Sequence, residues 1–441
     1  MLNQNRVSAF KYRIKREEIG KCFNSVKNGG IRTSIFHEQK DAEDWFQYDI
    51  ELPKYEISHQ GSTGRCWIHA ALNMIRPSII KEHHLKYISL SHNFIAFYDL
   101  LEKANYFLEL MIKMIDKDIN SRLLNLKLLY PIQDAGQWFF FQNIVEKYGI
   151  VTQEAMLDTV HSQNTSELIG VLSDLLRETA SIMRSEYEQS ARINEIEQIK
   201  EETLYRVYRI LILSLGEPPE RFTVNLELKD GSIRKECEVT PKEFYQKYVC
   251  ENYNTDYCMI VNFPLKSKPY YENYKVSWLG NVWEKENGAF LNLPMAVVKE
   301  LVQKQLSTGI PVWFGCDSRV YVDRKNGIYT LENYDLEKLG FQHRMLNKRE
   351  NLQYMLSNLT HAMVIRGVAY DKEGRTKRWL IENSYGEETG HQGCFSVSDQ
   401  WFDLFVYEVV IKKEFMDSSL LDSYKKESII LPPWDVLGNL A

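Results

Sequence analysis

The chain has 441 residues, of which 44% are hydrophobic and 26% are charged, and its net charge is −6 at pH 7. This composition is typical of a globular protein with a large buried core, and it excludes a disordered chain. The acidic balance argues against nucleic acid or an anionic membrane surface as the main partner.

Seven cysteines are scattered along the chain without a CxxC pair. An odd, dispersed set is not a disulfide framework, so we expect reduced thiols and a cytoplasmic location. The N-terminal stretch lacks the apolar core of a signal peptide. No segment approaches the roughly 20 apolar residues of a membrane span. We therefore expect no membrane insertion.

The first 50 residues are polar and mixed, and we expect them to form a peripheral N-terminal arm. We expect residues 51–60 to form an extended segment that leads to Gln60. The stretch QGSTGRCWIHAALN, residues 60–73, then combines a glycine-containing loop with an apolar run, which predicts a buried helix beginning at Cys66. The free N–H groups at a helix start would favour a thiolate there. The alternative is that Cys66 is only a small buried hydrophobic residue.

Helical patterns dominate the next part of the chain. Apolar residues recur at helical spacing over 88–130, and the turn DAGQW at 134–138 leads into a helix over 139–148 that Gly149 ends. A long helical segment over 164–215 ends at Gly216. It reads as part of an inserted, helical and hairpin region spanning 160–290.

The pattern then changes to that of strands. A β-hairpin is predicted around Asp230-Gly231, followed by a helix that begins at Pro241 with a capping box. Residues 250–290 are predicted to be loop-rich. A helix after Pro294, a buried strand within 311–317, and an antiparallel meander from His361 through 411 complete the C-terminal half. The last residues, 428–441, form an apolar tail.

Two strands of that meander supply groups that a thiol nucleophile needs. His361 opens one strand and Asn383 ends the next, so the two side chains can meet across the hairpin. The amide oxygen of Asn383 could hold one ring nitrogen of His361 and leave the other facing Cys66. Gln60 could donate to an oxyanion. Taken singly, His361 could be a partly buried strand residue and Asn383 a turn former.

The sequence gives little support for a metal site, a nucleotide-binding motif or a second catalytic histidine. His69 lies three residues after Cys66 but has no orienting partner nearby in sequence, and His83-His84 lack partners at metal-ligand spacing. There is no HExxH, GxxxxGK[ST] or GxGxxG motif. We therefore expect no metal and no cofactor, and we expect the cysteines other than Cys66 to be structural.

The sequence resembles the bleomycin hydrolase and aminopeptidase C family, the cytosolic branch of the papain-like cysteine peptidases. The Gly and Cys-Trp of the papain signature recur at Gly64 and Cys66-Trp67, whereas Thr63 stands where secreted members have a disulfide cysteine. Seven blocks match in the same order: GRCW (64–67), DAGQW (134–138), PVWFGCD (311–317), THAM (360–363), ENSYG (382–386), WFDLFVYEVV (401–410) and ILPPWDVLGNLA (430–441).

The resemblance implies an α+β, papain-like fold. Its N-terminal half would be helical around a central cysteine helix, its C-terminal half an antiparallel β half, and large, mainly helical insertions would interrupt it. It also implies a homohexameric, cytosolic aminopeptidase without a cofactor, with Cys66, His361 and Asn383 as catalytic groups and Gln60 at the oxyanion. The tail would enter the cleft, where the carboxylate of Ala441 pairs with the substrate amine, beside Gly136 and Ala135. Activity on bleomycin-like amides or thiolactones is implied too.

Two departures from the family pattern stand out. Tyr385 occupies the place of the tryptophan that shields the Asn–His hydrogen bond, and Ala135 replaces a second glycine. Neither removes a catalytic group. Three other functions stay open at this point: an endopeptidase of the same fold, a nucleic-acid-binding ring with secondary peptidase activity, and transfer of the acyl group to an amine. The absence of a Lys/Arg-rich run counts against the second.

Overall fold

A computed structural model describes residues 1–16, 20–39, 42–190, 192–249, 253–286, 288–340 and 342–441. Cys250, one of the cysteines expected to be structural, lies outside these residues, as does the side chain of Cys22. Cys258, Cys316 and Cys394 are buried free thiols, whereas Cys237 is exposed. None of the helices within the described ranges is long and apolar enough to cross a membrane.

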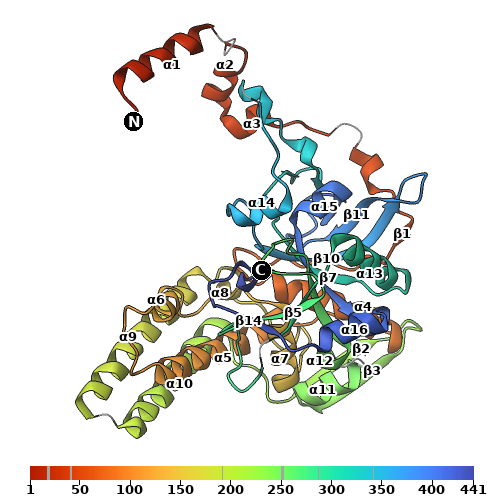
Figure 1. Cartoon of the computed structure of the whole chain (residues 1–441). Coiled ribbons are helices and arrows are strands. Elements are labelled where there is room, and N and C mark those ends of the chain that lie inside the picture. The colour runs from red at the N-terminus through yellow and green to blue at the C-terminus, as the bar shows by residue number, and fades with distance from the viewer. Residues whose placement is uncertain (17–19, 40–41, 191, 250–252, 287, 341) are drawn as a thin grey trace.

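The N-terminal arm extends away from the body of the molecule (Figure 1). It contains α1 (Gln4–Arg16), α2 (Gly20–Gly29) and α3 (Ile31–Ile35). Backbone hydrogen bonds from His37 to Asn333 and from Asp335 to Ile35 hold its base, both at 2.9 Å. The chain then passes η1 (Ala42–Phe46) and adds β1 (Ile50–Glu51) beside β10 of the main sheet.

A buried helix begins at Cys66, as the sequence predicts. This helix, α4 (Cys66–Glu82), is buried on nearly every side from Cys66 to Arg76, because it packs between neighbouring helices and the main sheet. Its helical neighbours are α5 (His92–Lys113), which Ser91 caps through the N–H of Phe94, and α7 (Trp138–Tyr148). Gly149, with φ 84°, follows α7 and ends it as expected. The shorter α6 (Arg122–Leu129) and α8 (Val160–Gln163) complete this half.

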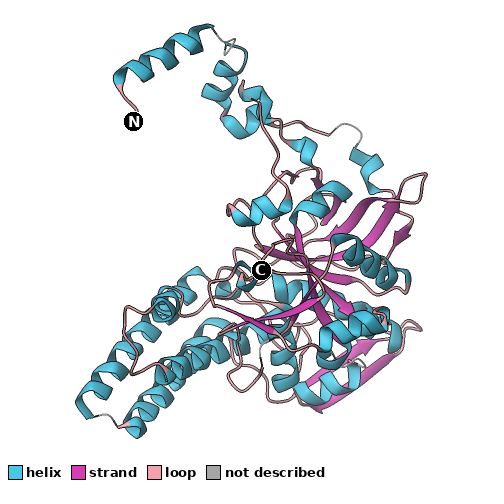
Figure 2. Cartoon of the chain, in the orientation of Figure 1, coloured by secondary structure: helices cyan, strands magenta, loops and turns pink. Residues whose placement is uncertain are grey.

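The long helical segment after residue 164 is two helices rather than one. α9 (Ser166–Ser190) and α10 (Ile193–Leu215) fold back on each other and project from the body as a hairpin (Figures 1 and 2). Their buried faces pack on each other and on α5. The predicted hairpin of β2 (Phe222–Glu227) and β3 (Ile233–Val239) is confirmed. So is the Thr240 capping box of α11 (Pro241–Tyr248).

The main sheet forms the core of the C-terminal half (Figure 2). Among the described residues its order is β14-β5-β6-β4-β13-β7-β10-β11-β12-β9-β8, so β7 and β10 are central and lie against α4. The α+β architecture expected from the sequence is confirmed. The strands are β4 (Tyr257–Val261), β5 (Glu272–Val276), β6 (Phe290–Asn292), β7 (Val312–Cys316), β8 (Val322–Asp323), β9 (Ile328–Tyr329), β10 (His361–Tyr370), β11 (Thr376–Glu382), β12 (Cys394–Ser398), β13 (Val406–Lys412) and β14 (Ile429–Leu431).

Helices and short turns connect these strands and cover the sheet. They are α12 (Tyr253–Asp256), α13 (Met295–Ser307), η2 (Leu331–Asn333), η3 (Leu336–Leu339), α14 (Lys348–Gln353), α15 (Asp399–Phe405), η4 (Lys413–Phe415), α16 (Ser418–Lys425) and η5 (Val436–Gly438).

One interpretation of the C-terminal half was incomplete and another was wrong. The described part of the region predicted to be loop-rich, 250–290, also contains β4 and β5, and β4 pairs with β13 inside the main sheet. The stretch read as a continuous meander is interrupted by α15, after which β13 pairs with β7 and β4 instead of β12. Ser398 starts α15 by accepting from the N–H of Trp401, and the helix buries Trp401, Phe402 and Phe405. These aromatic residues suit a strand pattern equally well, so periodicity alone could not separate the two.

The cap of α15 gives a stability prediction. Replacing Ser398→Ala removes the hydroxyl that accepts from Trp401 N–H at 3.3 Å, and the loss of such a cap costs about 1 kcal/mol. Ser121 also precedes a helix, α6, but its side chain makes no capping hydrogen bond, so Ser121→Ala is the matched control. Urea unfolding should show a lower midpoint for Ser398→Ala only. Equal midpoints for the two variants would contradict the role assigned to the cap.

Candidate active site

Cys66 stands at the first position of α4, directly after a tight loop. Arg65 precedes the helix, and its carbonyl accepts from the N–H groups of Ile68 and His69. The loop needs glycine at residue 61, because its φ is +65° and an added Cβ would lie 2.2 Å from the carbonyl oxygen of Gln163. The N–H of Cys66 is the first of the helix and lies too early in the chain to donate to a carbonyl within it. It is therefore free to donate into the site.

The side chain of Gln60 is held in one orientation. Its Nε2 donates to the carbonyl of Thr63 at 2.7 Å, and its Oε1 accepts from the hydroxyl of Ser384 at 2.5 Å. A primary amide has two N–H donors, so one remains for a substrate atom. Gln60 is buried at the same loop that leads to Cys66. Ser384, which fixes its orientation, follows Asn383 directly and was not picked out from the sequence.

His361 and Asn383 meet across the β10–β11 pair. His361 Nε2 lies 2.9 Å from Asn383 Oδ1, and the backbone N–H of Ser384 donates to the same oxygen at 2.8 Å. A backbone N–H can only donate, which identifies that amide atom as oxygen. Nε2 of His361 must therefore carry a hydrogen, and Nδ1 of the neutral ring keeps its lone pair.

The strand that begins at His361 also contacts the cysteine. The backbone N–H of Ala362 donates to Cys66 Sγ at 3.4 Å, so the thiol lies beside the start of β10. The ring of Tyr385 stacks on the His361 ring, with centroids 5.1 Å apart and planes 16° apart. Cys66, His361 and Asn383 are all buried, with 2%, 4% and 1% of their surfaces exposed. The structure thus brings together residues from three separate parts of the chain.

Burial outweighs the helix start in setting the charge of the thiol. Burial raises the pKa of Cys66 to about 12, although backbone N–H groups, that of Ala362 first, lower it. The expected stabilisation of a thiolate is thus present but smaller than the desolvation cost. Burial also lowers the pKa of His361 to about 4, against the hydrogen bond that its ring donates to Asn383. Burial thus disfavours the charged form of both groups, and it opposes the stabilisation of a thiolate that the helix start was expected to give.

The DAGQW turn lies against the residue after the cysteine. Trp67 Nε1 donates to the carbonyl of Asp134 at 2.8 Å, and a Cβ on Gly136 would lie 2.5 Å from the Trp67 indole. Asp134 Oδ2 accepts from the N–H of Gly64 at 2.7 Å. Asp134 was quoted from the sequence only as part of a motif. Its link to the loop before Cys66 is a feature that the sequence did not reveal.

The C-terminal tail pairs with this same turn. Ala441 N donates to Gly136 O at 3.0 Å, and Gly136 N donates to Ala441 O at 3.2 Å. Ala441 is 3% exposed. Further contacts hold the tail: Gln137 Nε2 donates to Asn439 O at 2.6 Å, and Lys268 pairs with Asp435 at 2.8 Å. The end of the tail is therefore fixed beside the turn that packs on Trp67.

A cavity of about 550 Å³ adjoins the tail. Ala135 lines it, together with Leu359, which lies two residues before His361, and Leu440 of the tail. Ala135 also turns its carbonyl toward Lys103 Nζ, at 2.7 Å. The structure thus places Ala135, Gly136 and Ala441 in one neighbourhood.

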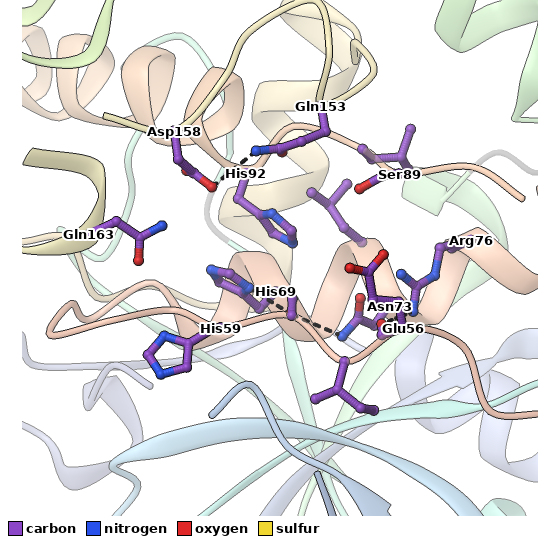
Figure 3. A pocket seen from close by; sticks show the side chains of 14 residues that line it. Glu56, His59, His69, Asn73, Arg76, Ser89, His92, Gln153, Asp158 and Gln163 are labelled. Carbon is purple, nitrogen blue, oxygen red and sulfur yellow. Dashed lines mark hydrogen bonds between the residues drawn. The ribbon is translucent and has the colours of Figure 1, made fainter. Parts of the chain in front are cut away.

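A separate cavity of about 290 Å³ lies along α4, and Figure 3 shows its lining side chains. His69 lies there with its ring stacked on His92 at 3.8 Å, and its Nδ1 is 2.8 Å from Ser58 Oγ. Burial lowers the pKa of both histidines, that of His92 to about 3, so both rings are neutral at pH 7. Cys66 and His361 do not line this cavity. Within the described ranges, no group of three or more His, Cys, Asp or Glu residues is placed to hold a metal ion.

Comparison with known proteins places this geometry in a family. The model of the Peptidase C1-like family matches residues 1–438. Aminopeptidase C of Streptococcus thermophilus is 37% identical over 422 residues, covering 96% of this chain and 95% of the relative. Bleomycin hydrolase of Rattus norvegicus is 32% identical over 402 residues, covering 90% of this chain and 88% of the relative.

A solved structure agrees along the whole chain. The crystal structure of PepW from Lactobacillus rhamnosis superposes with a TM-score of 0.95 at 37% identity, covering 100% of this chain and 99% of that one. The papain-like fold and the family expected from the sequence are therefore confirmed. This chain belongs to the Peptidase C1-like family, among the relatives of aminopeptidase C and bleomycin hydrolase.

Proposed function

We propose that this chain removes N-terminal residues from peptides as a cysteine aminopeptidase, with Cys66 as nucleophile, His361 as acid and base, and Asn383 as the group that orients His361. The cysteine aminopeptidase class follows from the relatives that match over nearly the full length. The observation that carries the residue roles is the contact pattern at His361. Its Nε2 is tied to Asn383 at 2.9 Å, and the next residue, Ala362, donates to Cys66 Sγ at 3.4 Å.

The first half of the reaction begins from the neutral pair. The Cys66 sulfur attacks the first peptide carbonyl while His361 Nδ1 takes the thiol proton, so no isolated thiolate has to exist in the buried site. The carbonyl oxygen becomes an oxyanion, which accepts from the Cys66 N–H and from the remaining Gln60 Nε2–H. The charge on the imidazolium is stabilised by Asn383 Oδ1, which already accepts from Nε2.

The second half releases the two products in turn. The imidazolium gives its proton to the leaving nitrogen as the C–N bond breaks, which leaves a thioester between Cys66 and the N-terminal residue. His361 Nδ1 then takes a proton from water as the water oxygen attacks the thioester carbonyl. The second tetrahedral intermediate breaks its C–S bond, and the sulfur regains a proton from His361. The stacked Tyr385 ring covers the His361 ring during both halves.

The tail gives the enzyme its preference for free amino termini in this proposal. Ala441 is paired with Gly136, and Gly136 packs on the residue next to Cys66. The carboxylate of Ala441 then sits where it can pair with a substrate ammonium, and the tail blocks longer extensions. Peptides with a free amino terminus are the substrates that this arrangement selects. The homohexameric ring, the cytoplasmic location and activity on bleomycin-like amides or thiolactones stay predictions from the resemblance.

The nucleophile is tested by Cys66→Ala. Removing the sulfur should abolish release of N-terminal residues from an unblocked peptide, because no acyl-enzyme can form. Cys237→Ala is the matched control, since that cysteine is exposed, and it should keep full activity. Peptidase activity that survives in Cys66→Ala would refute the assignment.

The oxyanion donor is tested by Gln60→Ala. The loss of one such donor typically lowers kcat on the order of 10²–10³-fold, and we expect that drop with KM little changed. Gln303→Ala is a control on α13, where the amide donates only to Lys299 O in the described contacts. Steady-state kinetics on one unblocked peptide distinguishes the two variants. A wild-type kcat in Gln60→Ala would contradict the role.

The tail is tested by removing residues 438–441. The truncated enzyme should cleave unblocked peptides less well and should accept N-acetylated or internal bonds, because the blocking segment and its carboxylate are gone. Ala441→Gly keeps the length and the carboxylate and should retain the preference for free amines. If the truncated enzyme discriminated against acetylated peptides as strongly as the full chain, the tail would not be the selecting element.

A further inference from the structure

Lys103 of α5 is buried beneath the turn that carries Gly136. Its Nζ donates to the carbonyl of Gln133 at 2.9 Å and to that of Ala135 at 2.7 Å. It also pairs with Asp99 Oδ2 at 2.6 Å. An ammonium group has three hydrogens, so these three partners account for all of them. Two of the three are backbone atoms of one short segment, which makes Lys103 a fixed support for that segment.

The surroundings of Lys103 hold the ammonium in place. Asp99 is buried and accepts from Asn281 Nδ2 at 3.0 Å, so the carboxylate that faces Lys103 is itself oriented. The Lys103 ammonium lies 5.4 Å from the centre of the Trp67 ring and 5.2 Å from that of Phe140. Buried charges are costly unless they are fully paired. The Lys103 ammonium contacts one carboxylate and two backbone carbonyls, and it lies near two aromatic rings.

The 133–136 segment links Lys103 to the tail. Lys103 binds the carbonyls of Gln133 and Ala135, so it fixes the residue directly before Gly136. The carbonyl of Gly136 accepts from the N–H of Ala441, and the N–H of Gly136 donates to a carboxylate oxygen of Ala441. Trp67 also holds this segment, because its Nε1 donates to the Asp134 carbonyl.

We infer that Lys103 is a positioning residue for amine recognition: it acts through the 133–136 segment to place Ala441, and so determines the preference for free amino termini. The inference rests on the proposed function of the tail. Lys103 has no direct part in bond breaking, because its three partners leave no hydrogen for the substrate. Its effect should therefore fall on substrate binding and on the choice between free and blocked amines rather than on the chemical step.

Lys103→Met tests this by a split between KM and kcat. KM for an unblocked peptide should rise on the order of tenfold, since charge-assisted hydrogen bonds to the segment are lost, while kcat stays within about threefold. The ratio of kcat/KM for the unblocked peptide to that for its N-acetylated form should fall by a similar factor. The rate at which iodoacetamide, a small neutral reagent, alkylates Cys66 should not change, because the catalytic groups stay in place.

A second variant separates positioning from stability. Lys103→Met leaves the buried Asp99 without its cation, which lowers stability. Asp99→Asn combined with Lys103→Met removes both charges and keeps an oxygen for Asn281. This double variant should be more stable than Lys103→Met and should show the same loss of amine preference. Lys200→Met is the matched control, because Lys200 of α10 is also a buried lysine. It pairs with Glu109 of α5 at 2.8 Å. It should leave KM and amine preference unchanged.

The outcomes separate this inference from the proposed function. If the wild type shows Cys66-dependent activity and prefers free amines, but both Lys103 variants match it in KM and preference, the inference on Lys103 is overturned and the proposed function stands. If the double variant regains wild-type KM, or if Lys200→Met shows the same rise, the effect is one of stability and the inference is again overturned. A wild type with no preference for free amines would overturn both.

Discussion

The hydrogen bond from the backbone N–H of Ala362 to the sulfur of Cys66 joins the two halves of the protein at the site. It is possible only because α4 lies directly against β7 and β10. A second link, from Trp313 Nε1 to the carbonyl of Trp67 at 3.2 Å, fixes the next residue of α4 to β7. Together they set the position of the thiol relative to the strand that begins with His361. The other groups of the site are arranged around this contact.

The same packing sets the electrostatics. A helix start and nearby N–H groups favour a negative sulfur and lower the pKa of Cys66. Burial raises that pKa by more, because it removes water from around the charge. The imidazole is subject to the same constraint, because burial disfavours its cation. Burial therefore acts in the same direction on both groups, because it disfavours the charged form of each. A site closed in this way suits chemistry in which proton transfer accompanies attack.

The sequence was most informative where chemistry leaves a local pattern. The loop with Gly61 and the apolar run after it located the start of α4. The strand pattern put His361 and Asn383 on neighbouring strands, and the hydrogen bond between them is present. The strand β4 and the helix α15 escaped prediction, because their aromatic and β-branched residues fit more than one element. Both are defined by long-range pairing and packing, which no local pattern encodes.

Contacts made by single polar side chains were harder still to foresee. Lys103 belongs to a helix that the sequence predicted well, but nothing in its neighbours indicates that its ammonium meets the carbonyls of residues 133 and 135. The partners of Gln60 were missed for the same reason. Ser384, which orients the Gln60 side chain, lies 324 residues later in the sequence. Such contacts depend on where segments meet in space, so they require the structure.

The contacts of Asp134 join the start of the α9–α10 hairpin to the loop before Cys66. Its Oδ2 accepts from the Gly64 N–H and from the hydroxyl of Thr165, the residue just before α9. The carbonyl of Gln163 accepts from the Ser62 N–H at 2.8 Å. The base of the projecting α9–α10 hairpin is thereby attached to the segment between Gln60 and Cys66. A displacement at the base of this hairpin would therefore also displace the loop that joins Gln60 to Cys66.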